Sequence, residues 1–259
     1  MNKSKRFSGF LGFIESYVTS NAIIYYFIRK LVIHLNLFEE DFNILNKYFN
    51  NKKINIIDIG ASDGVATNFF LKNLNVNNIY CYEPSKIFFK QLLKLKKTNN
   101  RIILKNYGLS YKTQKYKIYY PTLTVLGFNL KLISYSFYNV NELKSQIKLD
   151  FTNYKKIKIK STLLKLHKYI TLSKKIDLIK IDVNGLEFEI VKAIEKQINR
   201  DKPLLVIENN SKLNEIYVFL KKYGYEKYFN HNKKFHKHKN QNKLDIFFIH
   251  KDKFTNILN

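Results

Sequence analysis

The stretch Ile54–Gly64 reads INIIDIGASDG and decides the fold, because an apolar run stops there in a turn that two glycines bracket. A short run of β-branched residues without alternation is typical of a strand buried on both faces, as in a parallel sheet covered by helices. Gly60 and Gly64 remove side chains where the backbone must turn, and they let a ligand approach the backbone closely. Ser62 or Asp63 can cap the following helix. The stretch therefore predicts a strand, a tight loop and a helix, with a ligand at the carboxyl end of the strand.

The loop also indicates which ligand it suits. It matches neither the G-x-G-x-x-G pyrophosphate fingerprint nor the G-x-x-x-x-G-K-S/T phosphate loop. Asp58 and Asp63 repel phosphate but can accept hydrogen bonds from an ammonium group. The next apolar run, Asn78–Tyr82, is followed by Glu83, where the hydroxyls of a ribose would lie. A cationic ligand with a ribose and no phosphate describes S-adenosylmethionine. The alternative is that Asp58-x-Gly60 is an ordinary strand-to-helix turn of an α/β protein.

Three more segments of the chain are distinctive: Tyr82–Ser85, Asn106–Ser110 and Ile176–Glu187. Together with Asp58–Gly64, they resemble the FkbM-type S-adenosylmethionine-dependent methyltransferases. The segment IDLIKIDVNGLE is the most specific, because the family usually writes it I-D-x-I-K-I-D-V-E-G-x-E. Asn184 stands where the family commonly has an acid. The resemblance extends over residues 52–250 and leaves the first fifty residues unexplained.

The order of apolar segments predicts an α/β fold. Strands are expected at residues 54–59, 78–82, 101–105, 178–181, 203–208, 225–229 and 245–250, with helices between them. They predict a seven-stranded, mostly parallel, Rossmann-like sheet with helices on both faces, and the resemblance implies the class I methyltransferase fold. A closing hairpin would place one strand antiparallel. The expected division is an N-terminal helical extension, residues 1–50, and a methyltransferase domain, residues 51–259.

The predicted cofactor site lies at the carboxyl ends of these strands. The Asn106 side chain can meet the edge of an adenine with a donor and an acceptor, and Tyr107 can either cover a ring face or pack in the core. The residues expected to bind S-adenosylmethionine are Asp58, Gly60, Ala61, Ser62, Gly64, Glu83, Pro84, Ser85, Asn106, Tyr107, Gly108 and Asp182.

Catalytic residues are expected in the signature segment. Leu178–Ile181 is a buried strand that delivers Asp182 to the carboxyl edge of the sheet, and Asn184 turns the chain into a helix with Glu187 in its first turn. A carboxylate there can orient or deprotonate an acceptor hydroxyl. Asp182, Asn184 and Glu187 are therefore the catalytic candidates, and the alternative for Glu187 is that it caps the helix.

Residues 111–160 are the least regular part and are expected to form either an acceptor-binding insertion or a small hydrophobic cap. Alternation predicts strands at 115–120 and 156–160. We expect a loop over Pro121–Gly127, an aromatic cluster at Tyr135–Tyr138 and a short helix over Ser161–His167. Near the carboxyl end of the chain, His231, His236 and His238 lie among Asn and Lys, so no metal site is predicted.

The chain has 259 residues and a formal net charge of +26, from 46 Lys and Arg against 20 Asp and Glu. Such a balance attracts anions such as nucleic acid, anionic lipid or acidic glycans. The charge is spread along the chain, so general solvation together with AT-rich codons is the preferred explanation, and an anionic partner is the alternative. A single cysteine, Cys81, fits a reducing, cytoplasmic location. Helices are expected over residues 14–36 and 39–50, with their apolar face on the core domain. Arg29 and Lys30 interrupt this segment too early for a membrane span, and the alternative is a helix at the inner membrane surface.

These observations predict an S-adenosylmethionine-dependent methyltransferase that acts on a small-molecule or glycan acceptor. The hydroxyl of a sugar comes from the resemblance, since the family is associated with O-methylation in glycan, polysaccharide and natural-product pathways. One alternative is an RNA-directed methyltransferase that uses the basic surface. Another is a binding protein of the same fold without catalysis, for which Asn184 is the hint.

Overall fold

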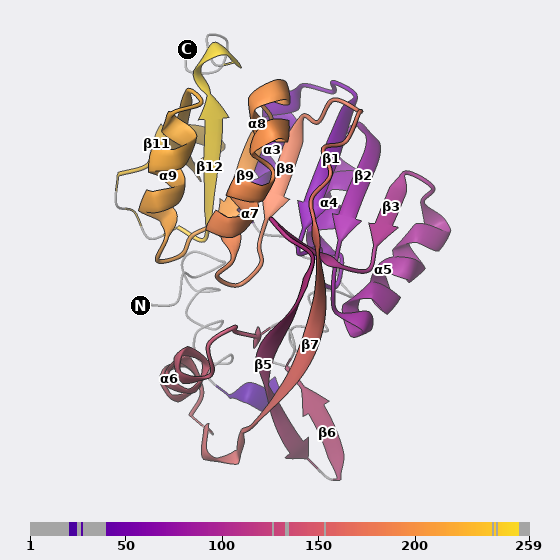
Figure 1. The fold of residues 1–259 in the computed structure, drawn as a ribbon, viewed down its shortest axis with the longest axis vertical. Helices are drawn as coiled ribbons and strands as arrows, with labels where there is room; N and C mark the ends of the chain where they lie inside the picture. The colour runs from indigo at the N-terminus through magenta and orange to yellow at the C-terminus, as the bar shows by residue number, and fades with distance from the viewer. Residues whose placement is uncertain are drawn as a thin grey trace. The chain divides into compact units, whose positions relative to one another are not determined.

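The structure is a computed structural model that describes residues 21–24, 27, 40–125, 127–132, 135–152, 154–239, 241 and 243–253. These residues gather into two compact units (Figure 1). As far as the ranges are described, the larger unit contains Phe38–Gln114 and Lys165–Asn259, and the smaller unit contains Met1–Leu37 and Lys115–Leu164. The expected domain boundary at residue 50 stays a prediction, because most of the segment before it lies outside the described residues.

The larger unit is built on one sheet of eight strands: β1 (Ile54–Ile59), β2 (Val76–Tyr82), β3 (Ile102–Lys105), β8 (Leu178–Ile181), β9 (Leu204–Glu208), β10 (Tyr225–His231), β11 (Lys234–Lys237) and β12 (Asp245–His250). Their order is β11-β10-β12-β9-β8-β1-β2-β3. Neighbouring strands from β3 to β9 are parallel. β12 is antiparallel to both β9 and β10, and β11 is antiparallel to β10. The ends of β1, β2, β8 and β9 therefore meet at one carboxyl edge.

Helices cover both faces of this sheet, as predicted. They are α3 (Ile44–Phe49), α4 (Val65–Asn73), α5 (Lys86–Thr98), α7 (Glu187–Ala193), α8 (Glu195–Asp201) and α9 (Leu213–Lys221), with the short 3-10 turns η1 (Glu40–Asn43) and η4 (Lys251–Lys253). One hydrophobic cluster joins α3, α4 and α5 to the sheet, and a second joins α7, α8 and α9. The neighbours Ile56 and Ile57 belong to different clusters. Successive side chains of a strand point to opposite faces, so β1 is buried on both faces of the sheet.

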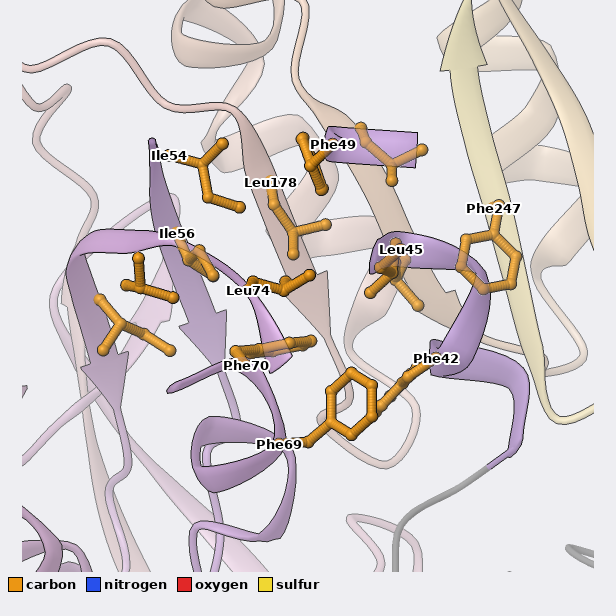
Figure 2. Close-up of a cluster of buried hydrophobic side chains, with 14 of the residues drawn as sticks. Phe42, Leu45, Phe49, Ile54, Ile56, Phe69, Phe70, Leu74, Leu178 and Phe247 are labelled. Atoms are coloured by element: carbon orange, nitrogen blue, oxygen red, sulfur yellow. The ribbon is translucent and has the colours of Figure 1, made fainter. Parts of the chain in front are cut away.

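Aromatic side chains fill the face that α3 and α4 cover (Figure 2). The Phe42 ring lies 5.7 Å from that of Phe69 and 5.6 Å from that of Phe70, between ring centroids. Phe42 belongs to η1 and Leu45 to α3, so the segment predicted over 39–50 is helical and packs on the core as expected. The helix predicted over 14–36 lies largely outside the described residues, of which 22–24 are helical. Within the part of the chain that is described, no helix combines the length and hydrophobicity that crossing a bilayer requires.

The sheet has eight strands where seven were predicted, because β11 pairs with β10 at the edge. Its sequence, KFHK, is short and polar, so it carries no apolar run. Phe235 holds the strand in place by packing edge-on against Phe247, with 5.3 Å between ring centroids. β11 and β12 run opposite to the other strands, so two strands and not one oppose the parallel direction.

The smaller unit carries nearly all of the long strand β5 (Gln114–Val125) and the first part of β7 (Lys158–Lys168), whose residues 165–168 belong to the larger unit. It also carries the short strand β6 (Phe128–Lys131), the helix α6 (Val140–Asp150) and η3 (Tyr154–Lys156). With β4 (Gly108–Ser110), the strands form a second sheet in the order β4-β7-β5-β6. Leu123, Leu132, Leu143, Ile147 and Phe151 form its core together with Ala22.

Two local predictions for this region are wrong. Pro121–Val125 continues β5 and is not a loop, and Ser161–His167 lies inside β7 and is not a helix. Leu164 and Leu166 are buried while Lys165 between them is exposed, which is the period of a strand with one buried face. The spacing of leucines at 163, 164 and 166 also fits a helix, so local periodicity alone could not decide.

Candidate functional site

Gly60 lies in the turn that follows β1 and has a left-handed backbone, with φ +78°. The N–H groups of Gly60 and Ala61 both donate to the carbonyl of Tyr82, at 3.0 and 3.2 Å, so the loop is fixed to the end of β2. A Cβ at Gly60 would lie 1.9 Å from the carbonyl oxygen of Asp182. The glycine is therefore required by contact between two loops of the protein, whereas the sequence suggested close approach of a ligand.

Gly64 precedes α4 and also has a positive φ, +86°. Gly64 itself is the N-cap of the helix, so neither Ser62 nor Asp63 occupies the N-cap position that the sequence suggested for them. A Cβ here would lie 2.6 Å from Leu95 and 3.0 Å from Leu92, both on α5. This glycine thus permits close packing of α4 against α5.

Glu83 follows β2 directly and lies beside this loop. Its Oε2 accepts the N–H of Ser62 at 2.8 Å, and its Oε1 accepts the N–H of Ser85 at 2.6 Å, across Pro84. Only 5% of Glu83 is exposed. Burial raises the pKa of Glu83 to about 7, and the two N–H donors only partly oppose this. The structure thus brings together Ser62, Glu83 and Ser85, three of the predicted cofactor residues.

The segment after β3 closes over the same edge. Asn106 donates its side-chain amide to the carbonyl of Glu83 at 2.9 Å, and the Tyr107 ring lies 5.8 Å from Tyr82 and 4.4 Å from His167, between centroids. A Cβ at Gly108 would lie 2.5 Å from Leu166. The adenine contacts expected of Asn106, Tyr107 and Gly108 stay predictions.

Asp58 lies in β1 beneath the loop and is completely buried. Its Oδ2 accepts a hydrogen bond from Thr67 Oγ1 at 2.6 Å, and its Oδ1 lies 3.9 Å from the ammonium nitrogen of Lys180. Burial raises the pKa of Asp58, while Lys180 and Thr67 oppose the rise. Lys180 also lies 3.1 Å from Asp182 Oδ2. Its role was not predicted, although a lysine inside the apolar strand LIKI signals a buried charge partner.

The turn after β8 is organised by Glu187. Asn184 and Gly185 both have positive φ, +54° and +110°. Glu187 is 1% exposed, and its carboxylate accepts the N–H groups of Val183 and Gly185 at 3.0–3.1 Å. Asn210, which sequence reasoning missed, donates to the same carboxylate at 2.7 Å. These contacts describe a residue that holds the loop, and the catalytic roles expected of Asn184 and Glu187 stay predictions.

Glu208 is a further acid at this edge that was not predicted as a site residue. It ends β9 next to Asp182, because Ile181 and Ile207 are paired in the β8–β9 ladder. Burial, then the charges of Asp182 and Glu187, raise the pKa of Glu208 well above the usual range of a glutamate. Glu208 ends a predicted strand, so its sequence position could have placed it at this edge, but only the pairing of β8 and β9 shows that Asp182 is its neighbour.

Comparison with known proteins gives one family and several distant structures. Residues 58–227 match the family described as the methyltransferase FkbM domain. A methyltransferase FkbM from Methylobacillus flagellatus KT is 15% identical, with a TM-score of 0.46, over 76% of this chain and 44% of that chain. This chain therefore spans less than half the length of that protein.

Two other solved structures are similarly distant. A precorrin-6y C5,15-methyltransferase from Geobacter metallireducens GS-15 is 12% identical, with a TM-score of 0.40, over 82% of this chain and 87% of that chain. The fibrillarin of Aeropyrum pernix, solved with S-adenosyl-L-methionine, is 10% identical, with a TM-score of 0.40, over 76% of this chain and 66% of that chain. No curated protein matches the chain.

Proposed function

Because the chain belongs to the FkbM methyltransferase family, we propose that it transfers a methyl group from S-adenosylmethionine to a hydroxyl oxygen of a sugar or another small polyhydroxylated acceptor. The observation that carries the choice of donor is Glu83, a buried carboxylate beside a glycine turn at the end of the second strand. Each of its oxygens accepts one backbone N–H and keeps a second lone pair. These lone pairs suit the two hydroxyl donors of a ribose.

Charge at the carboxyl edge also suits this donor. The chain as a whole is strongly basic, yet this edge is lined by acids and contains one buried lysine, Lys180. The acids are Asp58, Asp63, Glu83, Asp182, Glu187 and Glu208. A site lined by carboxyl groups favours a cation, which promotes their ionisation, and S-adenosylmethionine carries a sulfonium and an ammonium group. When bound, the donor would supply a methyl group that an oxygen nucleophile can attack.

The residues that would hold the donor follow from these contacts. Glu83 would accept the ribose hydroxyls, and the Gly60–Ser62 backbone would pass alongside the methionine part. Asp58, being completely buried, would act through Lys180 and the loop above it. Asp182, whose side chain is 40% exposed, is the acid that an acceptor could reach. A carboxylate there can orient the hydroxyl for an in-line displacement.

The smaller unit has a basic surface that suits an anionic partner. All nine of its lysines between residues 115 and 164 are exposed: Lys115, Lys117, Lys131, Lys144, Lys148, Lys155, Lys156, Lys158 and Lys160. Of its two acids in this range, Asp150 is buried and bonded to Tyr135 and Gln146, which leaves Glu142 as the exposed acid. We therefore include acidic glycans and RNA among the acceptors to be tested.

The test is a transfer assay with methyl-labelled S-adenosylmethionine against neutral glycans, acidic glycans and RNA in parallel. We expect label in a glycan as a methyl ether, which withstands mild alkali. Glu83→Ala should weaken binding of the donor by about 1–3 kcal/mol in calorimetry, because the ribose loses its acceptor. Label in RNA would support the RNA-directed alternative. A protein that neither binds the donor nor labels any acceptor would be the non-catalytic alternative.

A further inference from the structure

Asp182 and Glu208 lie side by side at the carboxyl edge of the sheet. Ile181 and Ile207 are paired in the parallel ladder of β8 and β9, so the residues that follow them occupy the same step. In-register residues of neighbouring strands project to the same face. The nearby Asp182 side chain accordingly raises the pKa of Glu208. Two neighbouring carboxyl groups share a site most favourably when one of them holds a proton.

The charges around this pair determine which member holds the proton. From β8, the Lys180 ammonium lies 3.1 Å from Asp182 Oδ2, which favours the ionised form of Asp182. From β12, Asp245 is paired with Glu208, and from α7 the Glu187 carboxylate adds further negative charge. The pKa of Glu208 is raised by burial first, then by Asp182 and Glu187, with Lys180 opposing. Glu208 is therefore the member with the greater affinity for a proton.

Exposure and hydrogen bonding separate this pair from the other acids of the edge. Glu187 is almost fully buried, and its carboxylate is bonded to Val183, Gly185 and Asn210. Asp182, by contrast, is 40% exposed and Glu208 is half-buried. An acceptor hydroxyl could therefore approach Asp182 and Glu208 but not Glu187.

We infer that Glu208 is the general base of the transfer and that Asp182, held ionised by Lys180, is the residue that orients the acceptor and increases the basicity of Glu208. This inference rests on the proposed function. The acceptor oxygen forms a bond to the methyl carbon while the bond from that carbon to the donor's sulfur breaks, with its electron pair remaining on sulfur. The O–H bond of the acceptor breaks in the same process, and its proton passes to the ionised Glu208 carboxylate. A base with a raised pKa suits a hydroxyl better than an ordinary carboxylate does.

The first experiment needs no acceptor. The side-chain carboxyl carbons of glutamate are labelled with ¹³C, and the signal of Glu208 is identified by its loss in Glu208→Gln. We expect Glu208 to titrate well above an ordinary glutamate, and its midpoint to fall by at least about one pH unit in Asp182→Asn. If Asp182→Asn does not fold, Asp182→Ser takes its place. Glu215→Gln removes an exposed acid on α9 and should leave the midpoint unchanged. If Glu208 titrates like an ordinary glutamate, or if Asp182→Asn leaves its midpoint unchanged, Asp182 and Glu208 do not share a proton and the inference is wrong.

The second experiment measures transfer rates on the acceptor that the labelling screen identifies. Glu208→Gln should lower kcat by about a hundredfold or more while donor affinity stays within about twofold. The parent rate should rise with pH through the NMR midpoint of Glu208, and the rise should move to lower pH in Asp182→Asn. If Glu208 has only a structural role, Glu208→Gln would still lower the rate, but the pH profile of the parent would not follow the Glu208 midpoint and Asp182→Asn would not shift it. A parent that shows the pair by NMR but labels no acceptor contradicts the proposed function, and it leaves Glu208 without a catalytic role.

Discussion

Glu83→Gln should remove the loss of stability that the parent undergoes as pH rises to neutrality. The pKa of Glu83 is raised to about 7 in the folded chain, against 4.5 when the group is exposed, and the largest cause is burial. Below pH 4.5 both the folded and the unfolded chain hold the proton, so the group does not make the unfolding free energy depend on pH. Between pH 4.5 and 7 the unfolded chain releases the proton while the folded chain keeps it, so stability falls as pH rises.

The size of the effect follows from the two pKa values. Each pH unit in this window costs about 1.4 kcal/mol, and the loss levels off at about 3 kcal/mol above pH 7. Glutamine is neutral at every pH, so the variant lacks this pH-dependent loss. Its amide N–H faces the backbone N–H of Ser62 or Ser85, which lowers its stability by a similar amount at every pH. The difference in unfolding free energy between Glu83→Gln and the parent should therefore increase by about 2–3 kcal/mol from pH 5 to pH 8.

Urea denaturation at pH 5, 6, 7 and 8, without donor, measures this difference. Glu215→Gln, which removes an exposed acid, serves as the matched control and should follow the parent at every pH. If the unfolding free energies of the parent and of Glu83→Gln change in parallel with pH, the reasoning is refuted.

The same ionisation should make donor affinity increase from pH 6 to pH 8 in the parent, because the ionised carboxylate accepts ribose hydroxyls better. Glu83→Gln should lose that pH dependence in calorimetry.

Three further predictions concern the loops of the site. Gly60→Ala should lower the unfolding free energy by far more than Gly127→Ala. Both glycines have a left-handed backbone, but only a Cβ at Gly60 would collide with the carbonyl oxygen of Asp182. Equal losses of stability in urea denaturation would contradict this. Glu187→Gln should cost about 2–4 kcal/mol, because an amide N–H would then face backbone donors, and a loss under about 1 kcal/mol would exclude the loop-holding role. Asn184→Gly should melt near the parent temperature while Asn184→Val should cost about 1–2 kcal/mol, since φ is +54°; equal melting temperatures for the two would argue against a strained turn.

The sheet was predictable because its central strands are unbroken apolar runs. Ile54–Ile59 and Leu178–Ile181 each end at a charged residue or a glycine, and the predicted strands match the observed ones closely. Parallel strands place all their carboxyl ends at one edge, so the acids that follow them could be placed together without knowledge of the strand order. Glu83 and Asp182 were identified for this reason.

The parts that could not be predicted depend on contacts between distant segments. Glu208 becomes a neighbour of Asp182 only through the pairing of β8 and β9. Asn210 bonds to Glu187 from 23 residues further along the chain, and the buried Lys180 is paired with Asp58 on another strand. The start of β7 was predicted as a strand, but Ser161–His167 was mistaken for a helix because its leucines fit both periods, and pairing with β4 and β5 decides between them.

The strands β5 and β7 also have a consequence for how this chain can vary. The polypeptide leaves the larger unit through β5 and returns through β7, and these two strands are neighbours in the second sheet. The fifty residues between Lys115 and Leu164 thus begin and end close together, in the manner of a hairpin loop. Closing such a segment costs little more entropy when it is lengthened, since the cost grows only logarithmically with length. Insertions, deletions or exchange of the whole segment can therefore be accommodated while the carboxyl edge of the larger sheet keeps its strands, so we expect sequence length to vary here between related proteins.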